Sequence, residues 1–363
     1  MPIRVLVVDD SALMRSIIVN IISADSEVAI VGIARNGLEA IEKTKLLSPD
    51  VVTLDIEMPK LNGLEALKYI MKEHPTRVLM VGSASSPEVV CEAISQGAAG
   101  FIANSSHILL KDSEEFAAEL VDKIKAVAAV NLSKQSASSD APIPQRADQT
   151  QLPDCREALF MNKVVAMGAS TGGLDALEVV LKSLPKGLPA SVLIVQHLPP
   201  GFSRSFVERI GQLSNMIVKE AEDGDVISPG VAFIAPGGFH MVVGKESGKP
   251  IIILEEGPKL WGVKPSVDKL MVSVAKRFKS RSIGVLLSGM GVDGANGMQL
   301  IKRWRGQTIV QDEETSIVFG MPKAALEKGC VDEVLPITGI AKALIHICAG
   351  EGAQDELRRL SLS

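Results

Sequence analysis

Short runs of apolar residues alternate with longer helical patterns along the first 125 residues of the chain. β-branched runs predict five strands, at Ile3–Val8, Val28–Ile33, Val51–Leu54, Arg77–Val81 and Gly100–Ile102. Between these runs, apolar residues recur at helical spacing, as at Leu13, Ile17, Ile18 and Ile21. Because strands that alternate with helices form a parallel sheet covered on both faces, this part is predicted to be a (βα)5 domain.

The pattern changes after this region, from about Asn131 to Pro153. Ser, Ala, Gln, Asp and Pro dominate there, and apolar residues show almost no periodicity. Such a segment cannot bury enough apolar surface to offset the entropy lost on folding. It is therefore predicted to be a flexible linker.

A second α/β pattern begins beyond the linker. Its predicted strands are Lys163–Gly168, Ser191–Gln196, Val231–Ala235, Ile251–Leu254, Ile283–Ser288 and Thr308–Gln311. The expected organisation is thus a (βα)5 domain over residues 1–125, a linker over 126–160, a doubly wound, mostly parallel α/β domain over 161–349, and a polar tail over 350–363.

Composition narrows the class of protein. Hydrophobic residues make up 46% of the 363 residues, which is enough to build two cores. The formal net charge of -5 provides no basic field for a phosphate backbone, so nucleic acid is not an expected partner. The N-terminus has no secretory signal, and no apolar run approaches the ~18 residues of a membrane span. We therefore expect a cytoplasmic protein without membrane insertion. The four cysteines lack metal-ligand spacing and are expected to be packing residues.

Three aspartates follow predicted strands of the first domain. Asp9 and Asp10 close the first strand, and Asp55 closes the third. The carboxyl ends of parallel strands meet at one edge, where three repelling carboxylates favour a divalent cation such as Mg²⁺. A carboxylate beside such a cation can also accept a phosphoryl group. Each aspartate taken alone is equally compatible with a helix cap.

The stretches Val5–Ser11 and Leu54–Leu67 make this cluster more specific, because they resemble the response-regulator receiver family. The resemblance covers nearly all of residues 1–125 and implies a flavodoxin-like fold. It implies that Asp55 is phosphorylated, that Asp9, Asp10 and Asp55 hold Mg²⁺, and that Ser83 is the hydroxyl switch residue.

One position departs from the receiver pattern. Receivers carry a lysine just after the fifth strand, where this chain has Asn104. Asparagine donates a hydrogen bond but supplies no positive charge, so coupling between phosphorylation and conformational change is expected to be weaker.

In the second domain, a glycine-rich turn follows the first strand. Gly168–Gly172 fits the G-x-S-x-G spacing of a nucleophile elbow, in which a sharp turn exposes the hydroxyl of Ser170. A strand-to-helix turn rich in glycine can equally cradle a phosphate. The turn alone does not decide between these two functions.

Two residues on later strands favour the nucleophile. His197 follows the strand at Ser191–Gln196, from where an imidazole can accept the serine proton. Asp293 follows the strand at Ile283–Ser288, from where a carboxylate can orient that imidazole. The chain order Ser, His, Asp differs from those of α/β-hydrolases, chymotrypsin and subtilisin, so these families are not implied. For His240 and the other histidines, core or surface roles are the default.

The main rival is a dinucleotide site. Gly289–Gly294 fits G-x-G-x-x-G after a strand, and Asp312 follows the next strand. Against this interpretation, Asp293 would place a negative charge inside the loop meant to hold a pyrophosphate. A nucleotide-binding oxidoreductase and a degenerate scaffold without catalysis are the alternatives to an esterase.

Residues 161–349 resemble the catalytic domain of the chemotaxis protein-glutamate methylesterase family. The resemblance rests on five stretches, Gly168–Gly173, Gln196–His197, Ile234–Gly237, Val263–Asp268 and Leu287–Ala295. It implies hydrolysis of glutamyl methyl esters on methyl-accepting chemoreceptors without a cofactor, with deamidation of glutamines as a related activity. It also implies the N–H of Met290 as an oxyanion donor. The resemblance further implies that the receiver covers the catalytic cleft until a chemotaxis histidine kinase phosphorylates it.

Overall fold

A computed structural model describes residues 2–82, 87–103, 113–128 and 163–349 of the chain. Contacts between residues divide the chain into two compact units, Met1–Asp140 and Ala141–Ser363. Each unit is built on its own parallel sheet, and the two are described separately.

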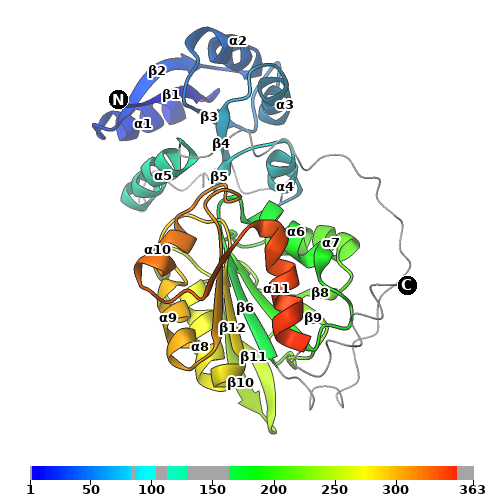
Figure 1. Cartoon of the computed structure of the whole chain (residues 1–363). Helices are drawn as coiled ribbons and strands as arrows, with labels where there is room; N and C mark the ends of the chain where they lie inside the picture. The colour runs from blue at the N-terminus through cyan, green and yellow to red at the C-terminus, as the bar shows by residue number, and fades with distance from the viewer. Residues whose placement is uncertain (1, 83–86, 104–112, 129–162, 350–363) are drawn as a thin grey trace. The chain divides into compact units, whose positions relative to one another are not determined.

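The first unit is a five-stranded parallel sheet with the order β2-β1-β3-β4-β5. Its strands are β1 (Ile3–Val8), β2 (Val28–Ala34), β3 (Val51–Asp55), β4 (Arg77–Gly82) and β5 (Gly100–Ala103). Its helices are α1 (Ala12–Ser23), α2 (Gly37–Leu47), α3 (Gly63–Glu73), α4 (Pro87–Ser95) and α5 (Ser113–Ala128). Helices α1 and α5 contact each other, while α3 contacts both α2 and α4, so the sheet is covered on two faces (Figure 1). The predicted (βα)5 fold is confirmed.

Polar residues other than aspartate begin the helices that follow β1, β2 and β3. Ser11 caps α1 and accepts from the Met14 N–H, and Asn36 caps α2. Asn62 caps α3 in a reciprocal capping box with Glu65. Since these side chains satisfy the first turns, the strand-end aspartates are not needed as caps.

The second unit contains a seven-stranded parallel sheet with the order β14-β13-β12-β6-β7-β9-β8. Its strands are β6 (Lys163–Ala169), β7 (Ala190–Gln196), β8 (Ile217–Glu220), β9 (Val231–Ile234), β12 (Ser282–Leu286), β13 (Gln307–Gln311) and β14 (Glu333–Leu335). Strands β6 and β7 are buried over nearly their whole length, as expected for a parallel sheet between helices. The predicted doubly wound α/β architecture is confirmed.

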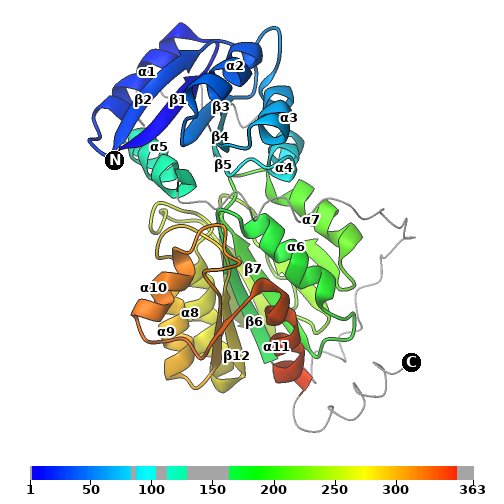
Figure 2. The same cartoon turned by 45° about the horizontal axis from the view of Figure 1, so that its top comes forward.

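Helices cover both faces of this sheet. One face carries α6 (Gly173–Ser183), α7 (Ser203–Leu213) and α11 (Ile337–Ala349), and the other carries α8 (Val267–Phe278), α9 (Ala295–Arg303) and α10 (Met321–Glu327) (Figures 1 and 2). A short 3-10 turn, η3 (Lys279–Arg281), joins α8 to β12. The core between sheet and helices includes Val267, Met271, Leu286 and Met298, all fully buried. Each such side chain contributes about 1.5–3 kcal/mol of burial free energy.

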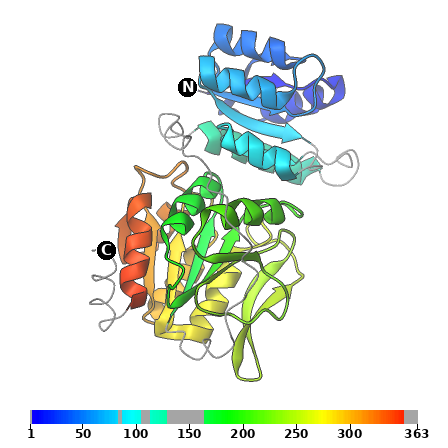
Figure 3. The same cartoon turned by 90° about the vertical axis from the view of Figure 1, so that its right-hand side faces the viewer.

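The strand pattern differs from the prediction in one region. Residues Ile251–Leu254 lie in β11 (Lys249–Glu255), which pairs antiparallel with β10 (His240–Glu246) as a separate two-stranded sheet. Figure 3 shows this hairpin in yellow-green, projecting from the second unit. Strands β8, β10 and β14 were not predicted. β8 and β14 are short edge strands. In β10 only Met241, Val242 and Val243 are consecutive apolar residues, so none of the three strands carries a long apolar run.

No helix among the described residues is long and apolar enough to cross a membrane. Cys330 and Cys348 are buried free thiols, and burial raises the pKa of the Cys348 thiol to about 12. Both therefore serve as packing residues. Cys155 lies outside the described residues, as does the side chain of Cys91.

Candidate active site and phosphoacceptor site

Ser170 lies where the order of the second sheet reverses. The chain proceeds from β6 to β7 on one side and places β12 on the other side of β6. Such a switch point opens a crevice at the carboxyl ends of the strands. The N–H of Ser170 donates to the Ser288 carbonyl at 3.0 Å, and the N–H of His197 donates to the Ala169 carbonyl at 3.1 Å. The loops after β6, β7 and β12 are thus tied together at this edge.

His197 and Asp293 form a hydrogen-bonded pair at the same edge. The Nε2 of His197 lies 2.9 Å from Oδ2 of Asp293, and their side chains are 10% and 3% exposed. Since an ionised carboxylate only accepts, Nε2 carries the hydrogen and Nδ1 keeps its lone pair. The imidazole is therefore held in a tautomer that can accept a proton.

Asp293 is held by three further donors. Its Oδ1 accepts from Ser266 Oγ at 2.8 Å and from the Asp268 N–H at 2.9 Å, and its Oδ2 accepts from the Val267 N–H at 2.7 Å. These donors form the first turn of α8, where the helix dipole favours an anion. Burial alone would raise the pKa of Asp293, but the bonds from His197 and these backbone N–H groups hold it below its ordinary value. The carboxylate stays ionised although it is buried.

His240 holds Ser266, which is one of the donors to Asp293. The ring is fully buried, with Nε2 donating to the Pro258 carbonyl at 2.9 Å and Nδ1 accepting from the Ser266 N–H at 3.2 Å. Burial lowers the pKa of His240, so the imidazole is neutral and suited to both bonds. Sequence reasoning did not assign Ser266 or His240 to the site. The only signal was that Ser266 lies in the Val263–Asp268 stretch and that His240 lies three positions after the Ile234–Gly237 stretch.

Glycines bring the backbone close to Ser170. A Cβ at Gly289 would lie 2.3 Å from Met321 Sδ and 3.0 Å from Ser170 Cβ. A Cβ at Gly173 would lie 2.3 Å from Gln196 Oε1, whose amide Nε2 donates to the Ser170 carbonyl at 2.9 Å. The loops can meet at Ser170 only because these positions lack side chains.

Two polar groups at this edge have no partner within the described part of the chain. Ser170 Oγ makes no hydrogen bond there, so it is not bonded to the imidazole in this state. The Met290 N–H also has no acceptor among these residues, although the neighbouring Gly289 N–H donates to the Val318 carbonyl at 3.0 Å. Catalytic hydrogen bonds are often long until a substrate binds.

The acids near a dinucleotide site at Gly289–Gly294 have other partners. Asp293 points into the protein and is 2% exposed. Asp312 Oδ1 accepts from the Thr315 N–H at 2.9 Å and from Thr315 Oγ1 at 2.6 Å, which fixes the turn after β13. Neither carboxylate is placed to bind a ribose.

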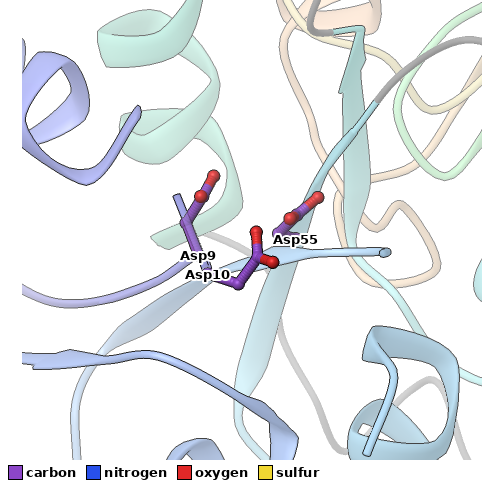
Figure 4. A group of neighbouring side chains, drawn as sticks. All are labelled: Asp9, Asp10 and Asp55. Atoms are coloured by element: carbon purple, nitrogen blue, oxygen red, sulfur yellow. The ribbon is translucent and has the colours of Figure 1, made fainter. Parts of the chain in front are cut away.

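In the first unit, the side chains of Asp9, Asp10 and Asp55 converge (Figure 4). One ligand atom from each lies within 4.8 Å of the others. Burial, with the charges of Asp9 and Asp10, raises the pKa of Asp55 to about 7, and burial also raises the pKa of Asp9. Arg15 Nη1 donates to the carbonyls of Asp9 and Asp10 at 2.7 and 2.8 Å, which fixes the turn but leaves the carboxylates facing one another.

The donor set fits a hard divalent cation, because three carboxylate oxygens converge. Asp9, Asp10 and Asp55 are the residues that would hold Mg²⁺. The predicted switch residue Ser83 and the divergent Asn104 lie outside the described residues.

Comparison with known proteins identifies two family models in the chain. The response regulator receiver domain matches residues 5–108, and the CheB methylesterase matches residues 165–344. A protein-glutamate methylesterase/protein-glutamine glutaminase of Pyrococcus abyssi is 43% identical over 95% of this chain and 93% of its own length. The chain belongs to this methylesterase family.

Other members of the family support the assignment. A relative of the same name from Thermotoga maritima is 42% identical over 95% of this chain and 98% of its own length. The crystal structure of the Thermotoga maritima CheB methylesterase catalytic domain matches with a TM-score of 0.51 and 42% identity, covering 51% of this chain and 98% of that one. The predicted family is therefore confirmed, together with its two kinds of domain.

Proposed function

We propose that the chain hydrolyses glutamyl methyl esters on methyl-accepting chemoreceptors and releases methanol. The observation that carries this proposal is the buried His197–Asp293 pair, whose Nδ1 lone pair lies at the strand edge that presents Ser170. The names of relatives that are about 42% identical over nearly the full chain support it.

In the proposed reaction, His197 Nδ1 takes the proton from Ser170 Oγ as that oxygen attacks the ester carbonyl. The tetrahedral oxyanion forms next to Gly289, where the Met290 N–H has no acceptor within the described residues. When the intermediate collapses, methanol leaves with the proton from the imidazolium. Water then attacks the glutamyl ester of Ser170, gives its proton to His197, and frees the glutamate carboxylate.

Asp293 acts on the imidazole rather than on the substrate. Its ionised carboxylate fixes the Nε2–H tautomer and stabilises the imidazolium that forms in each step. Deamidation of glutamine side chains would follow the same steps with ammonia as the leaving group, so we propose it as a second activity of this site.

We also propose that phosphorylation of Asp55 controls the esterase. A chemotaxis histidine kinase would supply the phosphoryl group, and Asp9, Asp10 and Asp55 would hold Mg²⁺. The cation would screen the charge between Asp55 and the incoming phosphoryl group. Ser83 would sense the phosphoryl group through its hydroxyl. Because the proposed kinase and receptor substrates are reached from the cytoplasm, we propose that the chain acts there.

Methanol release from methylated receptor membranes tests the esterase. The purified chain should release methanol, and Ser170→Ala should reduce the rate by several orders of magnitude. Ser183→Ala is a matched control, because this serine caps no helix and its hydroxyl donates only to the Val179 carbonyl on an exposed surface. Equal rates for Ser170→Ala and the unchanged chain would rule out Ser170 as the nucleophile.

Phosphorylation is tested with Mg²⁺ and a small labelled phosphodonor. The unchanged chain should become labelled, while Asp55→Ala should not. Asp50→Ala is the control, because Asp50 lies at the start of β3, at the opposite end of the strand. Labelling of Asp55→Ala to the same extent would exclude Asp55 as the acceptor.

A further inference from the structure

Trp261 occupies an unfavourable position beside the candidate active site. Leu260 and Val263 exchange two backbone hydrogen bonds of 3.0 Å, and the residues between them, Trp261 and Gly262, have φ values of +54° and +76°. This is the geometry of a type I′ turn, which favours Asn-Gly. A bulky aromatic residue at positive φ is rare and strained, and such strain is often retained at functional sites.

The indole is also held in one orientation although it faces solvent. Trp261 is 59% exposed, yet its Nε1 donates to the buried Asp268 Oδ2 at 2.9 Å. Asp268 in turn donates its N–H to Asp293 Oδ1 at 2.9 Å. The exposed ring is thus only one residue removed from the His197–Asp293 pair.

Two more exposed apolar side chains lie on loops tied to the same place. Val292, 44% exposed, precedes Asp293 directly. Phe239, 38% exposed, lies on a loop joined to the Trp261 loop by the Gly238 N–H, which donates to the Lys264 carbonyl at 3.3 Å. Phe239, Trp261 and Val292 are three of the six exposed large hydrophobic residues described in the second unit.

We propose that Trp261 is a specificity-determining residue that docks the protein segment carrying the glutamyl ester. The inference rests on the function proposed above. The ester must reach Ser170 at this edge, so the flanking segment of the protein substrate covers the surface around it. An apolar side chain beside the modified glutamate packs on the indole, with Phe239 and Val292 completing the contact. A purely structural turn would gain stability from Asn at position 261 and would not expose a tryptophan.

Steady-state kinetics of the full chain, activated with Mg²⁺ and a small phosphodonor, test the proposal. Trp261→Asn restores a favoured turn sequence, so its thermal midpoint should equal or exceed that of the unchanged chain. Its KM for methylated receptor should rise about tenfold with little change in kcat, as for loss of a central aromatic contact. Trp304→Asn is the control, because Trp304 is 42% exposed but ends α9 at the edge remote from Ser170.

Phosphonylation of Ser170 by a small fluorophosphonate, in which Oγ displaces fluoride from phosphorus, separates docking from positioning. This probe needs the triad but no protein surface, so Trp261→Asn should react at the unchanged rate. A parallel loss of probe reactivity would show that Trp261 acts through Asp268 and would overturn the proposal. An unchanged KM would also overturn the proposal. This includes the case in which the activity without phosphodonor rises, because the indole would then contact the first unit instead of the substrate.

Fluorescence gives a readout without turnover, because the chain has only two tryptophans. In Trp304→Phe combined with Ser170→Ala, all indole emission comes from Trp261. A soluble methylated receptor fragment should shift this emission to shorter wavelength, whereas no change at saturating fragment would overturn the proposal. If the unchanged chain released no methanol, the proposed esterase function itself would be wrong. That result differs from equal KM values in an active enzyme, which would contradict only the role of Trp261.

Discussion

Gly289 lies so close to Ser170 that it leaves no room for a side chain. A methyl group at this position would lie 2.3 Å from Met321 Sδ and 3.0 Å from Ser170 Cβ. Real atoms do not approach so closely, so either the Met321 side chain or the loop after β12 must move. Movement of that loop would also displace the Met290 N–H that follows Gly289.

Gly289→Ala is therefore expected to reduce kcat for methanol release strongly and to destabilise the fold by about 1–3 kcal/mol. Methanol assays and urea unfolding measure the two effects. Gly211→Ala on α7 is the control, because its added methyl group meets no atom within 4 Å and alanine favours a helix. If Gly289→Ala kept full activity, the loop would not need its close approach to Ser170.

Asp175 is a half-buried acid in the first turn of α6. Burial, with repulsion from Glu178, raises its pKa to about 6, and Arg209 offsets this only in part. Because the folded state binds the proton more tightly than the unfolded state, ionisation of Asp175 destabilises the fold. The unchanged chain should thus lose stability from this group as the pH rises through 6.

Asp175→Asn should consequently raise the free energy of unfolding at pH 8, by an amount on the order of 1–3 kcal/mol. The gain should shrink as the pH falls below 6, where Asp175 becomes protonated in the folded protein. Denaturant titrations at pH 5 and pH 8 measure this difference. Glu208→Gln, an exposed acid on α7, should show no such dependence.

At the scale of elements, helix α8 binds the carboxylate of Asp293. Ser266 caps this helix by accepting from the Lys269 N–H at 3.4 Å, and the same hydroxyl donates to Asp293 Oδ1. His240 in strand β10 accepts from the Ser266 N–H. The β10–β11 hairpin and α8 therefore position the orienting acid together.

Ser266→Ala removes both the cap and one donor to Asp293. We expect a loss of about 1 kcal/mol of stability and a fall in kcat, with the Val267 and Asp268 N–H groups still holding the acid. Asn62→Ala, which breaks the capping box of α3 in the other unit, is the control. It should lose comparable stability without lowering kcat of the phosphodonor-activated chain. Equal kcat values for the two variants would show that Ser266 contributes to stability but not to catalysis.

Each of the two parallel sheets gathers polar residues at the carboxyl ends of its strands. The first gathers Asp9, Asp10 and Asp55 at its edge, and the second gathers Ser170, His197 and Asp293. Each unit has its own core, so each can fold around its own site. If phosphorylation of Asp55 controls the esterase as proposed, that control must act through the arrangement of the units.

Removal of residues 1–150 should release the esterase from this control. The shortened chain should release methanol at a rate that no phosphodonor changes, while the full chain should become faster with Mg²⁺ and phosphodonor. Asp55→Ala in the full chain should behave like the unphosphorylated protein. If the shortened and unphosphorylated full chains had equal rates, the first unit would not inhibit the second.

Most strands of both sheets, and the polar residues that follow them, could be predicted from the local sequence. Apolar periodicity is local, and buried parallel strands such as β6 and β7 carry it strongly. Because parallel strands bring their carboxyl ends to one edge, Ser170, His197 and Asp293 could be grouped from strand positions alone. Short edge strands such as β8 and β14 lack this periodicity, so they escaped prediction.

The contacts that hold the site come from the packing of segments far apart in the chain. The bonds from Ser266 and Asp268 to Asp293, and from Ser266 to His240, join residues more than twenty positions apart in the chain. No sequence period reports such contacts, because they depend on how a helix, a hairpin and a sheet pack together. The same packing leaves Trp261 exposed with its indole bonded to Asp268, which its position in the sequence did not indicate.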